Sequence, residues 1–304
     1  MLRINDLILL LVIFLSVLGA ILMPRLGAPF QSFPLYLMML LLFLSFLSIK
    51  LDAVFHIARE FARSILFLSL LKTIALPIGI YFLCKVLYPS YAIAALLLSG
   101  ISTGVVAPFI SNVVKANSPL VLVIVVITSL IAPFTLPAIA KMLLSRSADI
   151  SMWSMIRMLC LVLFVPIGAV EILRRIWPRI VATMMKRQFP VSLVTIALIN
   201  LGVFSRYADF FRQKPTTILE ALVVAIILAG IYLLVGILAL PSGTIENQLS
   251  AAISMGNINN VLIIVFASQF FGPLEPTVAA MYIFPFFGLI LPLRVYSHRR
   301  QGEM

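Results

Sequence analysis

One apolar stretch of the chain, AISMGNINNVLIIVF at residues 252–266, carries the polar side chains best suited to binding. Asn257, Asn259 and Asn260 follow directly after Gly256. An asparagine side chain offers both donors and an acceptor, so it can serve a ligand or backbone groups that a helix leaves unpaired. At helical spacing Asn257 and Asn260 share a face and Asn259 does not. An interrupted helix therefore explains the group better than contact with one neighbouring helix does.

Lys72 is a second residue of this kind, because it lies inside an apolar stretch that runs from residue 64 to residue 87. A lysine placed deep in a membrane costs about 2.5–3.5 kcal/mol on insertion scales. In one interpretation its ammonium snorkels to the membrane interface. In the other, the fixed charge braces interrupted helices from within, or releases a proton during a transport cycle.

Small polar residues in the other apolar stretches complete the candidate set for substrate or ion binding. A hydroxyl in a helix also bonds readily to its own backbone, so each of them has a purely structural alternative. The remaining candidates are Ser102, Thr103, Ser111, Asn112, Thr128, Ser129 and Ser254. We expect the helices to be interrupted at Gly104, Pro108 and Gly256. Proline removes a backbone hydrogen-bond donor, and glycine in the interior of a helix destabilises it.

Membrane-spanning helices must position these residues. The chain of 304 residues is 63% hydrophobic and 11% charged, whereas a soluble domain is usually about 45–50% apolar and about 25% charged. This composition predicts an all-α polytopic membrane protein. Because a span needs roughly 20 mostly apolar residues, ten transmembrane helices are expected. They lie near residues 6–23, 31–49, 64–87, 90–114, 118–143, 151–173, 189–206, 217–240, 247–271 and 274–294.

The net charge of +12 is explained by basic loops rather than by a nucleic-acid partner. The larger share of the Lys and Arg residues falls in loops on the side of the N-terminus, which predicts that both termini are cytoplasmic. We expect an integral protein of the plasma (inner) membrane with the lipid bilayer as its surroundings. The segment DAVFHIAREFARS at residues 52–64 suits a helix that lies on the membrane surface.

Three short motifs recur about half a chain later. They are ISTG at 101–104 with ISMG at 253–256, PF at 133–134 with PF at 285–286, and GIY at 79–81 with GIY at 230–232. This predicts two repeats, at about 1–145 and 150–296, with five helices each. An odd number of crossings inverts the second repeat, which is typical of secondary transporters. Helices 4 and 9 would then be broken and meet near the bilayer midplane, with half-helix N-termini that favour an anion.

These segments resemble the bile acid:sodium symporter family. The stretch VVKANSPLVLVIVVITSLIAPFTLPAI is similar to a basic residue, a small residue and Asn followed by the family's fifth span, and SMGNINNVL is similar to its ninth-span motif through Gly256, Asn259 and Leu262. The resemblance implies one membrane domain over residues 1–304 with crossing helices 4 and 9. A core domain, about 64–143 and 217–294, would move against a panel domain, about 6–49 and 151–206.

The resemblance also implies sodium ligands, and here the chain departs from the family pattern. The family's ninth-span Glu falls on Ser254, its third-span Gln on Lys72, and its fourth-span Ser-Asn pair on Ala107 and Pro108. A hard cation is normally held by several oxygen ligands, with carboxylates among them. No metal ligand is therefore assigned. Two mechanisms are therefore open. One is sodium symport, and the other is a sodium-independent or proton-coupled cycle in which Lys72 replaces the sodium ion.

The sequence as a whole favours a secondary transporter of a small or amphipathic organic anion, with no cofactor other than the sodium ion of the symport alternative. An enzyme would need a nucleophile with its base, or metal ligands, inside the spans, and the sequence offers neither arrangement. A non-transporting receptor or assembly protein on the same scaffold is the alternative from another class. The substrate, the direction of transport and the oligomeric state, monomer or oligomer, stay open.

Overall fold

The structure is a computed structural model that describes residues 4–49, 61–144, 151–241 and 243–302. Within these ranges the regular secondary structure is helical, and one isolated backbone bridge joins Thr103 and Ile258. The all-α class predicted from the sequence is confirmed. Most of the predicted surface helix at residues 52–64 lies outside the described residues.

Six helices of the described residues are long and apolar enough to cross a membrane, which supports a polytopic membrane protein. They are Ala62–Leu87, Ser118–Leu144, Met152–Ile176, Pro178–Ser205, Thr216–Ala239 and Leu274–Ser297. A seventh span results if Leu7–Leu22 and Pro24–Phe30, which meet at a bend of 111°, are counted together. The ten spans in two inverted repeats stay a prediction.

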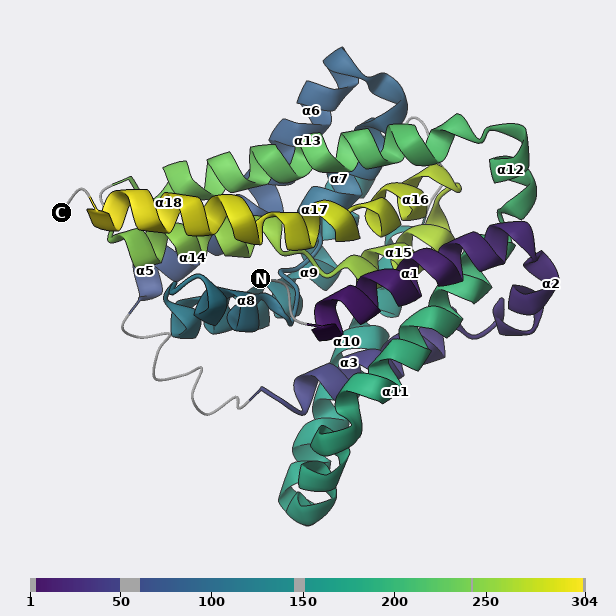
Figure 1. The fold of residues 1–304 in the computed structure, drawn as a ribbon, viewed down its shortest axis with the longest axis horizontal. Helices are drawn as coiled ribbons and strands as arrows, with labels where there is room; N and C mark the ends of the chain where they lie inside the picture. The colour runs from purple at the N-terminus through teal and green to yellow at the C-terminus, as the bar shows by residue number, and fades with distance from the viewer. Residues whose placement is uncertain (1–3, 50–60, 145–150, 242, 303–304) are drawn as a thin grey trace.

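The helices that the sequence assigns to the panel contact one another. They are α1 (Ile4–Leu22), α2 (Pro24–Gly27), η1 (Ala28–Phe30), α3 (Pro34–Phe46), α10 (Met152–Ile176) and α11 (Pro178–Ser205), and the short helix α12 (Ala208–Gln213) follows them. Helix α11 contacts both α1 and α3, and α10 also contacts α3. Figure 1 shows α10 and α11 at the lower edge of the molecule, away from α6 and α13 at its upper edge.

The helices assigned to the core are shorter and more often interrupted. They are α5 (Ala62–Leu70), η2 (Leu71–Ala75), α6 (Leu76–Leu87), η3 (Pro89–Tyr91), α7 (Ala92–Gly100), α8 (Ala107–Val113), α9 (Ser118–Leu144), α13 (Thr216–Ala239), α14 (Ile245–Gly256), α15 (Asn260–Phe270), α16 (Leu274–Met281), α17 (Ile283–Gly288) and α18 (Ile290–Gly302). Segment η2 has π-helical winding, a form that is rare and usually local to functional sites.

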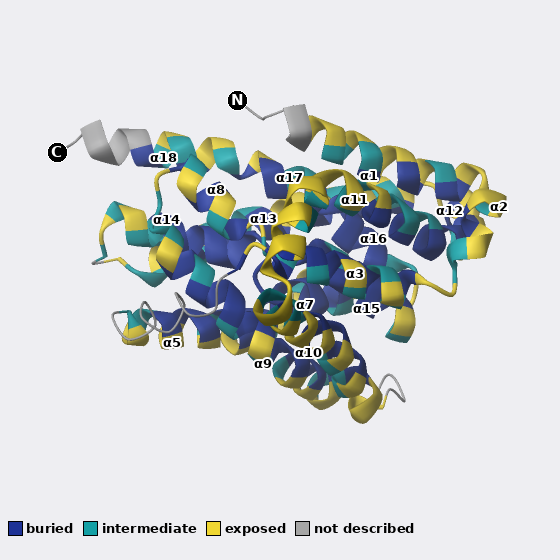
Figure 2. Cartoon of the chain, turned by 90° about the horizontal axis from the view of Figure 1, so that it is seen from below, coloured by how far each residue is buried: buried dark blue, intermediate teal, exposed yellow. Residues whose placement is uncertain are grey.

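Apolar side chains cover the outside of the fold as well as its inside. Leu11, Leu15 and Leu22 of α1 are 53–63% exposed, and Figure 2 shows exposed residues along the outer sides of α1 and α10. Such a surface is unusual for a protein in water. It suits the hydrocarbon of a bilayer, where apolar side chains face lipid.

One helix begins earlier than the sequence suggests. Helix α11 starts at Pro178, whereas the apolar stretch predicted a span from residue 189. Proline is favoured at the first helical position, where its missing N–H costs nothing. The added turns carry mostly exposed residues, with Arg179, Lys186 and Arg187 among them, so a hydropathy pattern places the start of the span too late.

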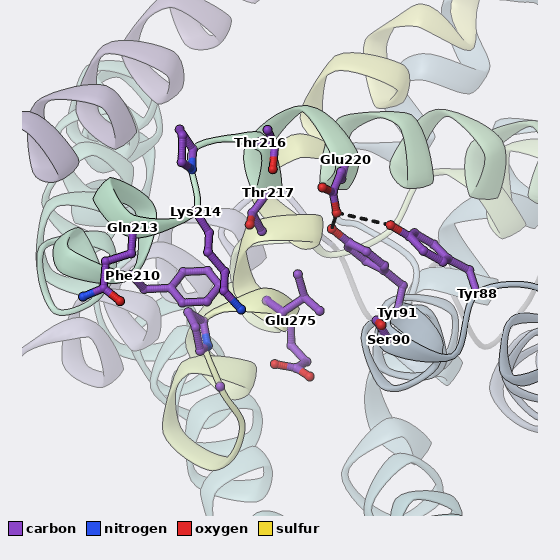
Figure 3. Close-up of a pocket in the computed structure, with 14 residues that line it drawn as sticks. Tyr88, Ser90, Tyr91, Phe210, Gln213, Lys214, Thr216, Thr217, Glu220 and Glu275 are labelled. Carbon is purple, nitrogen blue, oxygen red and sulfur yellow. Dashed lines mark hydrogen bonds between the residues drawn. The ribbon is translucent and has the colours of Figure 1, made fainter.

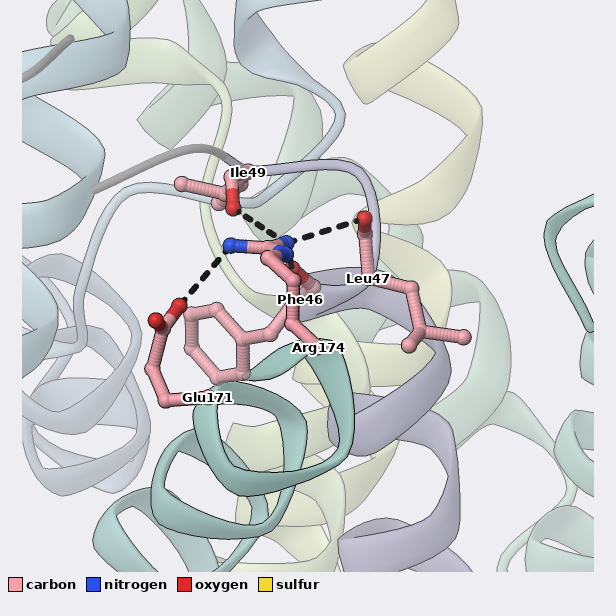
Figure 4. A network of polar contacts seen from close by, with 5 residues as sticks. All are labelled: Phe46, Leu47, Ile49, Glu171 and Arg174. Carbon is pink, nitrogen blue, oxygen red and sulfur yellow. Dashed lines mark hydrogen bonds and ion pairs between the residues drawn. The ribbon is translucent and has the colours of Figure 1, made fainter. Parts of the chain in front are cut away.

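Arg174 of α10 forms hydrogen bonds with the backbone at the end of α3 (Figure 4). Its guanidinium donates to the carbonyl oxygens of Phe46, Leu47 and Ile49 at 3.5, 3.2 and 2.8 Å, and pairs with Glu171 at 2.8 Å. The last carbonyls of a helix have no partner inside the helix. Arg174 donates to the last of them, that of Phe46, and to two carbonyls just past the helix, and so holds this end of α3 against α10.

Candidate functional site

The two helix breaks predicted from the sequence lie against each other. The first separates α7 from α8, and the second separates α14 from α15. Between them Thr103 and Ile258 form the isolated antiparallel bridge. The Gly104 N–H donates to the carbonyl of Asn257 at 2.7 Å, and the Asn259 N–H donates to that of Ser102 at 3.0 Å. Each break therefore satisfies backbone groups of the other, as non-helical chain at membrane depth requires.

Gly104 lets the two breaks approach this closely. A Cβ atom at this position would lie 2.7 Å from the carbonyl oxygen of Ile258. Gly256 is less restricted, since its Cβ would lie 2.7 Å from Cδ1 of Leu289, the end of a flexible side chain. Close packing against backbone therefore requires glycine at position 104, in addition to the loosening of the helix that the sequence suggested.

Threonine and serine side chains of three elements support the paired breaks. The Thr103 hydroxyl donates to the carbonyl of Ser254 at 2.8 Å, and the Thr103 N–H donates to the hydroxyl of Thr128 at 3.1 Å. The Thr128 hydroxyl itself donates to Ile124 in α9 at 2.7 Å, and that of Ser254 to Ser250 in α14 at 2.7 Å. The hydroxyls of Thr103, Thr128 and Ser254 thus donate to backbone carbonyls of the protein, which is a structural role.

The C-terminal end of α14 receives donors from distant parts of the chain. The Lys72 ammonium donates to the carbonyl of Met255 at 3.1 Å and lies 5.5 Å from the ring centre of Tyr232. The hydroxyl of Tyr282 donates to the carbonyl of Gly256 at 2.7 Å. Lys72 does not snorkel, because its side chain is fully buried.

Several polar atoms at the breaks have no hydrogen-bond partner within the described part of the chain. They are the hydroxyls of Ser102 and Ser129, both amide atoms of Asn257 and of Asn260, and Nδ2 of Asn259. Oδ1 of Asn259 accepts from the Leu262 N–H at 3.4 Å and so caps α15. Buried polar atoms are normally paired, so this group is available to a ligand.

A cavity of about 450 Å³ adjoins the paired breaks. On one side it is lined by Gly104, Asn259 and Asn260, at the break and at the N-terminus of α15. On the other side lie side chains of α1, α3 and α11. Its other lining residues include Leu9, Ile13, Met38, Leu42, Ser45, Gln188, Phe189, Ser192, Ile196 and Phe287. Mostly apolar walls with a few polar groups are typical of a binding site for an organic ligand.

A second cavity, of about 740 Å³, lies at the other ends of α7 and α15. Figure 3 shows Tyr88 and Tyr91 turned toward Glu220 of α13, whose carboxylate accepts from their hydroxyls at 3.2 and 3.1 Å. Lys214 and Glu275 also line this cavity. It is far more polar than the first cavity.

Helices α7 and α15 contact each other and run between the two cavities. Leu97 of α7 and Phe266 of α15 are fully buried. Near the second cavity the hydroxyl of Tyr207, which precedes α12, donates to the carbonyl of Ser268 in α15 at 3.2 Å. The two cavities are therefore separated by a packed apolar layer.

Three of the sequence candidates lie beyond the paired breaks. Pro108 is the second residue of α8 and so begins the half-helix, as expected of a proline. The Ser111 hydroxyl donates to the Pro108 carbonyl at 2.6 Å, within the same helix. Asn112 is exposed and does not line the cavity at the breaks. Ser111 and Asn112 are thus not brought together with the asparagines of α15.

Other residues of the site were not identified from the sequence. Tyr232 and Tyr282 lie in apolar stretches and read as ordinary core residues, and nothing local in the sequence links them to Lys72 or Gly256. Gln188 lies just before the predicted start of its span at residue 189, where the sequence predicts a loop. The recurring GIY motif at 230–232 ends at Tyr232 and is a signal in the sequence that marks this residue.

Comparison with known proteins agrees with this geometry. Residues 34–214, more than half of the chain, match the sodium bile acid symporter family. No curated protein gives a significant match to the chain. The members of this family are transporters. On its sequence match and its helical, membrane-suited fold, the chain belongs to the sodium bile acid symporter family.

Proposed function

We propose that this protein is a secondary transporter that carries an amphipathic organic anion by alternating access. The proposal rests chiefly on the cavity at the paired breaks, where the N-terminus of α15 meets the unpartnered amide of Asn260. The N-terminus of a helix is the positive end of its dipole, and in α15 the Asn260 and Leu262 N–H groups already donate to the Ile258 carbonyl and to Oδ1 of Asn259, so the dipole and the Asn260 side chain are what the site offers an anion. An anionic group can bind there while the apolar body of the substrate contacts the cavity walls.

The side chain of Asn260 is the main candidate for contact with the anionic group. It is 7% exposed, lines the cavity, and has neither Nδ2 nor Oδ1 paired within the described residues. Asn259 adds a free Nδ2 beside it. Ser45, Gln188 and Ser192 are the polar groups on the opposite wall, so substrate would be held between the core and panel domains.

The two cavities at opposite ends of α7 and α15 support the proposal of alternating access. With both termini in the cytoplasm, the cavity at the breaks lies on the cytoplasmic side, near the start of α1 and the end of α3. The more polar cavity beside Glu220 would then belong to the outer side. Movement of the core against the panel would close one and open the other, as in other transporters with broken helices.

The test measures binding of anions to the purified full-length chain in detergent, from the rise in its melting temperature. Cholate, a phenyl sulfate and a branched short-chain carboxylate are the probes. A ligand that binds only the folded state stabilises it in proportion to RT ln(1+[L]/Kd). We expect at least one of these anions to raise the melting temperature of the wild-type protein, and a matched neutral alcohol to leave it unchanged.

Asn260→Ala should weaken binding of that anion about tenfold to a hundredfold, since a hydrogen bond to a charged group contributes about 1.5–3 kcal/mol. Thr183→Ala, which alters an exposed residue of α11 away from the cavity, is the control and should bind like the wild type. Proteoliposomes then show whether the bound anion is moved. A folded protein that binds or transports none of the probes would contradict the proposal and favour a receptor or assembly role.

A further inference from the structure

Lys72 has an unusual position for a charged side chain. It is the second residue of the π-helical segment η2, and its side chain is 0% exposed. Among the buried residues of the described ranges it is the only charged one. A lone ammonium at such depth costs several kcal/mol unless polar groups surround it. The contacts of its ammonium must therefore offset that cost.

Those contacts are with the negative end of a broken helix. Met255 is the penultimate residue of α14, so its carbonyl is among the last four, which lack partners inside the helix and carry the negative end of the dipole. The Lys72 ammonium donates to it at 3.1 Å, and the ring of Tyr232 lies 5.5 Å away on another helix. In transporters with broken helices, half-helix C-termini of this kind coordinate sodium or protons.

The neighbouring carbonyls at this end of α14 also have donors already. Ile253 accepts from the Asn257 N–H at 2.8 Å, Ser254 from the Thr103 hydroxyl at 2.8 Å, and Gly256 from the Tyr282 hydroxyl at 2.7 Å. Asn257 itself accepts from the Gly104 N–H at 2.7 Å. The end of α14 is thus fully paired by the protein, with Lys72 supplying the positive charge.

The residues at the breaks do not fit a sodium ion. A hard cation is normally held by about six oxygens, with carboxylates among them. No Asp or Glu is among the buried residues in the part of the chain that the structure describes, and the buried carboxylate oxygen Oε2 of Glu275 lines the second cavity rather than the breaks. Among the described side chains, the oxygens left without a donor near the breaks are the neutral Ser102 and Ser129 hydroxyls and the amide oxygens of Asn257 and Asn260. An ammonium bonded to Met255 would in addition repel a second cation.

We propose that the Lys72 ammonium is a built-in cation that occupies the C-terminal end of α14 in place of a bound sodium ion. The protein then needs no sodium for folding, and it moves its anion without sodium coupling. The second statement rests on the proposed transport function, whereas the first does not. If Lys72 only linked η2 to α14 as a structural contact, there would be no reason to expect stability and transport to be independent of sodium.

The first experiment compares melting temperatures of the full-length wild type in detergent with NaCl, KCl or choline chloride at constant ionic strength. We expect the same melting temperature in all three salts, up to several hundred millimolar sodium. A rise that saturates with sodium and is absent with potassium would overturn the proposal, because it would show a bound sodium ion. This measurement needs no variant and no substrate.

The second experiment uses Lys72→Met, which keeps the apolar stem and removes the charge, and Lys72→Gln, which keeps a neutral donor. Both should melt several degrees below the wild type in sodium-free buffer, with Lys72→Met the lower. Lys85→Gln, at an exposed position of the same span, is the matched control and should melt like the wild type. A Lys72→Met protein as stable as the wild type would contradict the proposal. If neither variant folds, the wild-type titration with sodium still decides.

Transport is measured as uptake of labelled cholate, or of whichever probe anion binds, into proteoliposomes with potassium or with an inward sodium gradient. Equal initial rates support the built-in cation. A several-fold faster uptake under the sodium gradient would overturn it while leaving the transport function intact. Absence of uptake under either condition would contradict the proposed transport function. The sodium titration of the melting temperature would then still test the role of Lys72.

Discussion

At the residue scale, Gly104 determines how closely the two broken helices approach. Gly104→Ala would place a methyl group 2.7 Å from the Ile258 carbonyl oxygen, and backbone on both sides leaves little room for adjustment. Overpacking of this kind costs about 1–3 kcal/mol. We expect a lower melting temperature in detergent, together with weaker anion binding, because the same shift displaces Asn259 and Asn260.

Gly79→Ala is the matched control for this substitution. Gly79 lies inside α6, and a Cβ atom there would meet nothing within 4 Å. Alanine favours a helix interior by about 0.5–1 kcal/mol over glycine, so this variant should melt at or slightly above the wild-type temperature. A Gly104→Ala protein as stable as Gly79→Ala would show that the breaks are not held as tightly as the structure indicates.

Residue types in the sequence predict the parts of the site that break a pattern. Three asparagines in an apolar stretch, and a lysine deep in another, are conspicuous because polar groups in a membrane need partners. Tyr232 and Tyr282 break no pattern, since aromatic residues are common in apolar helices, and only the fold brings them to Lys72 and Gly256. Asn112 is predicted from the sequence but does not line the cavity. A polar residue close to a proline in the sequence does not indicate which face of a short helix it occupies.

At the element scale, Arg174 joins α10 to the last carbonyl of α3 and to two carbonyls that follow the helix. Arg174→Ala removes these bonds, and hydrogen bonds to charged groups contribute about 1.5–3 kcal/mol. We expect a lower melting temperature, with Arg174→Lys intermediate because an ammonium lacks the planar fork of a guanidinium. Arg175→Ala, at the exposed neighbouring position, should leave the melting temperature unchanged. Equal effects at both positions would mean that charge alone matters there.

Helix existence is easier to predict from the sequence than helix continuity. Apolar length alone places spans near residues 118–143 and 217–240, and helices α9 and α13 occupy these stretches. Residues 274–294 are equally apolar, yet they form the successive helices α16, α17 and the start of α18. Such interruptions depend on contacts with other helices, which a hydropathy pattern does not contain.

At the scale of the whole molecule, the two cavities on opposite sides of α7 and α15 predict opposite accessibility. In a variant with Cys84 and Cys160 replaced by serine, Ser192→Cys would report on the cavity at the breaks and Ser90→Cys on the second cavity. With cytoplasmic termini, a membrane-impermeant thiol reagent should modify Ser192→Cys from the cytoplasmic side and Ser90→Cys from the outer side. The bound anion should slow modification of Ser192→Cys.

The cysteine-free protein, which should not be modified, is the control for this labelling. Modification of Ser192→Cys from the outer side alone would contradict the predicted orientation of the termini. Modification of both cysteines from the same side would argue against two separate cavities. The experiment therefore tests the arrangement of the whole chain, independently of which anion is carried.

The fixed ammonium of Lys72 has an electrical consequence. A cation that is part of the protein returns to its starting position in every cycle, so it adds nothing to the charge that crosses the membrane. Each turnover then transfers only the negative charge of the substrate. A potential of 100 mV, negative inside, contributes about 2.3 kcal/mol per charge, which corresponds to roughly a fifty-fold concentration ratio. At an energised membrane such a carrier is biased toward export of its anion, and its current should reverse with the voltage.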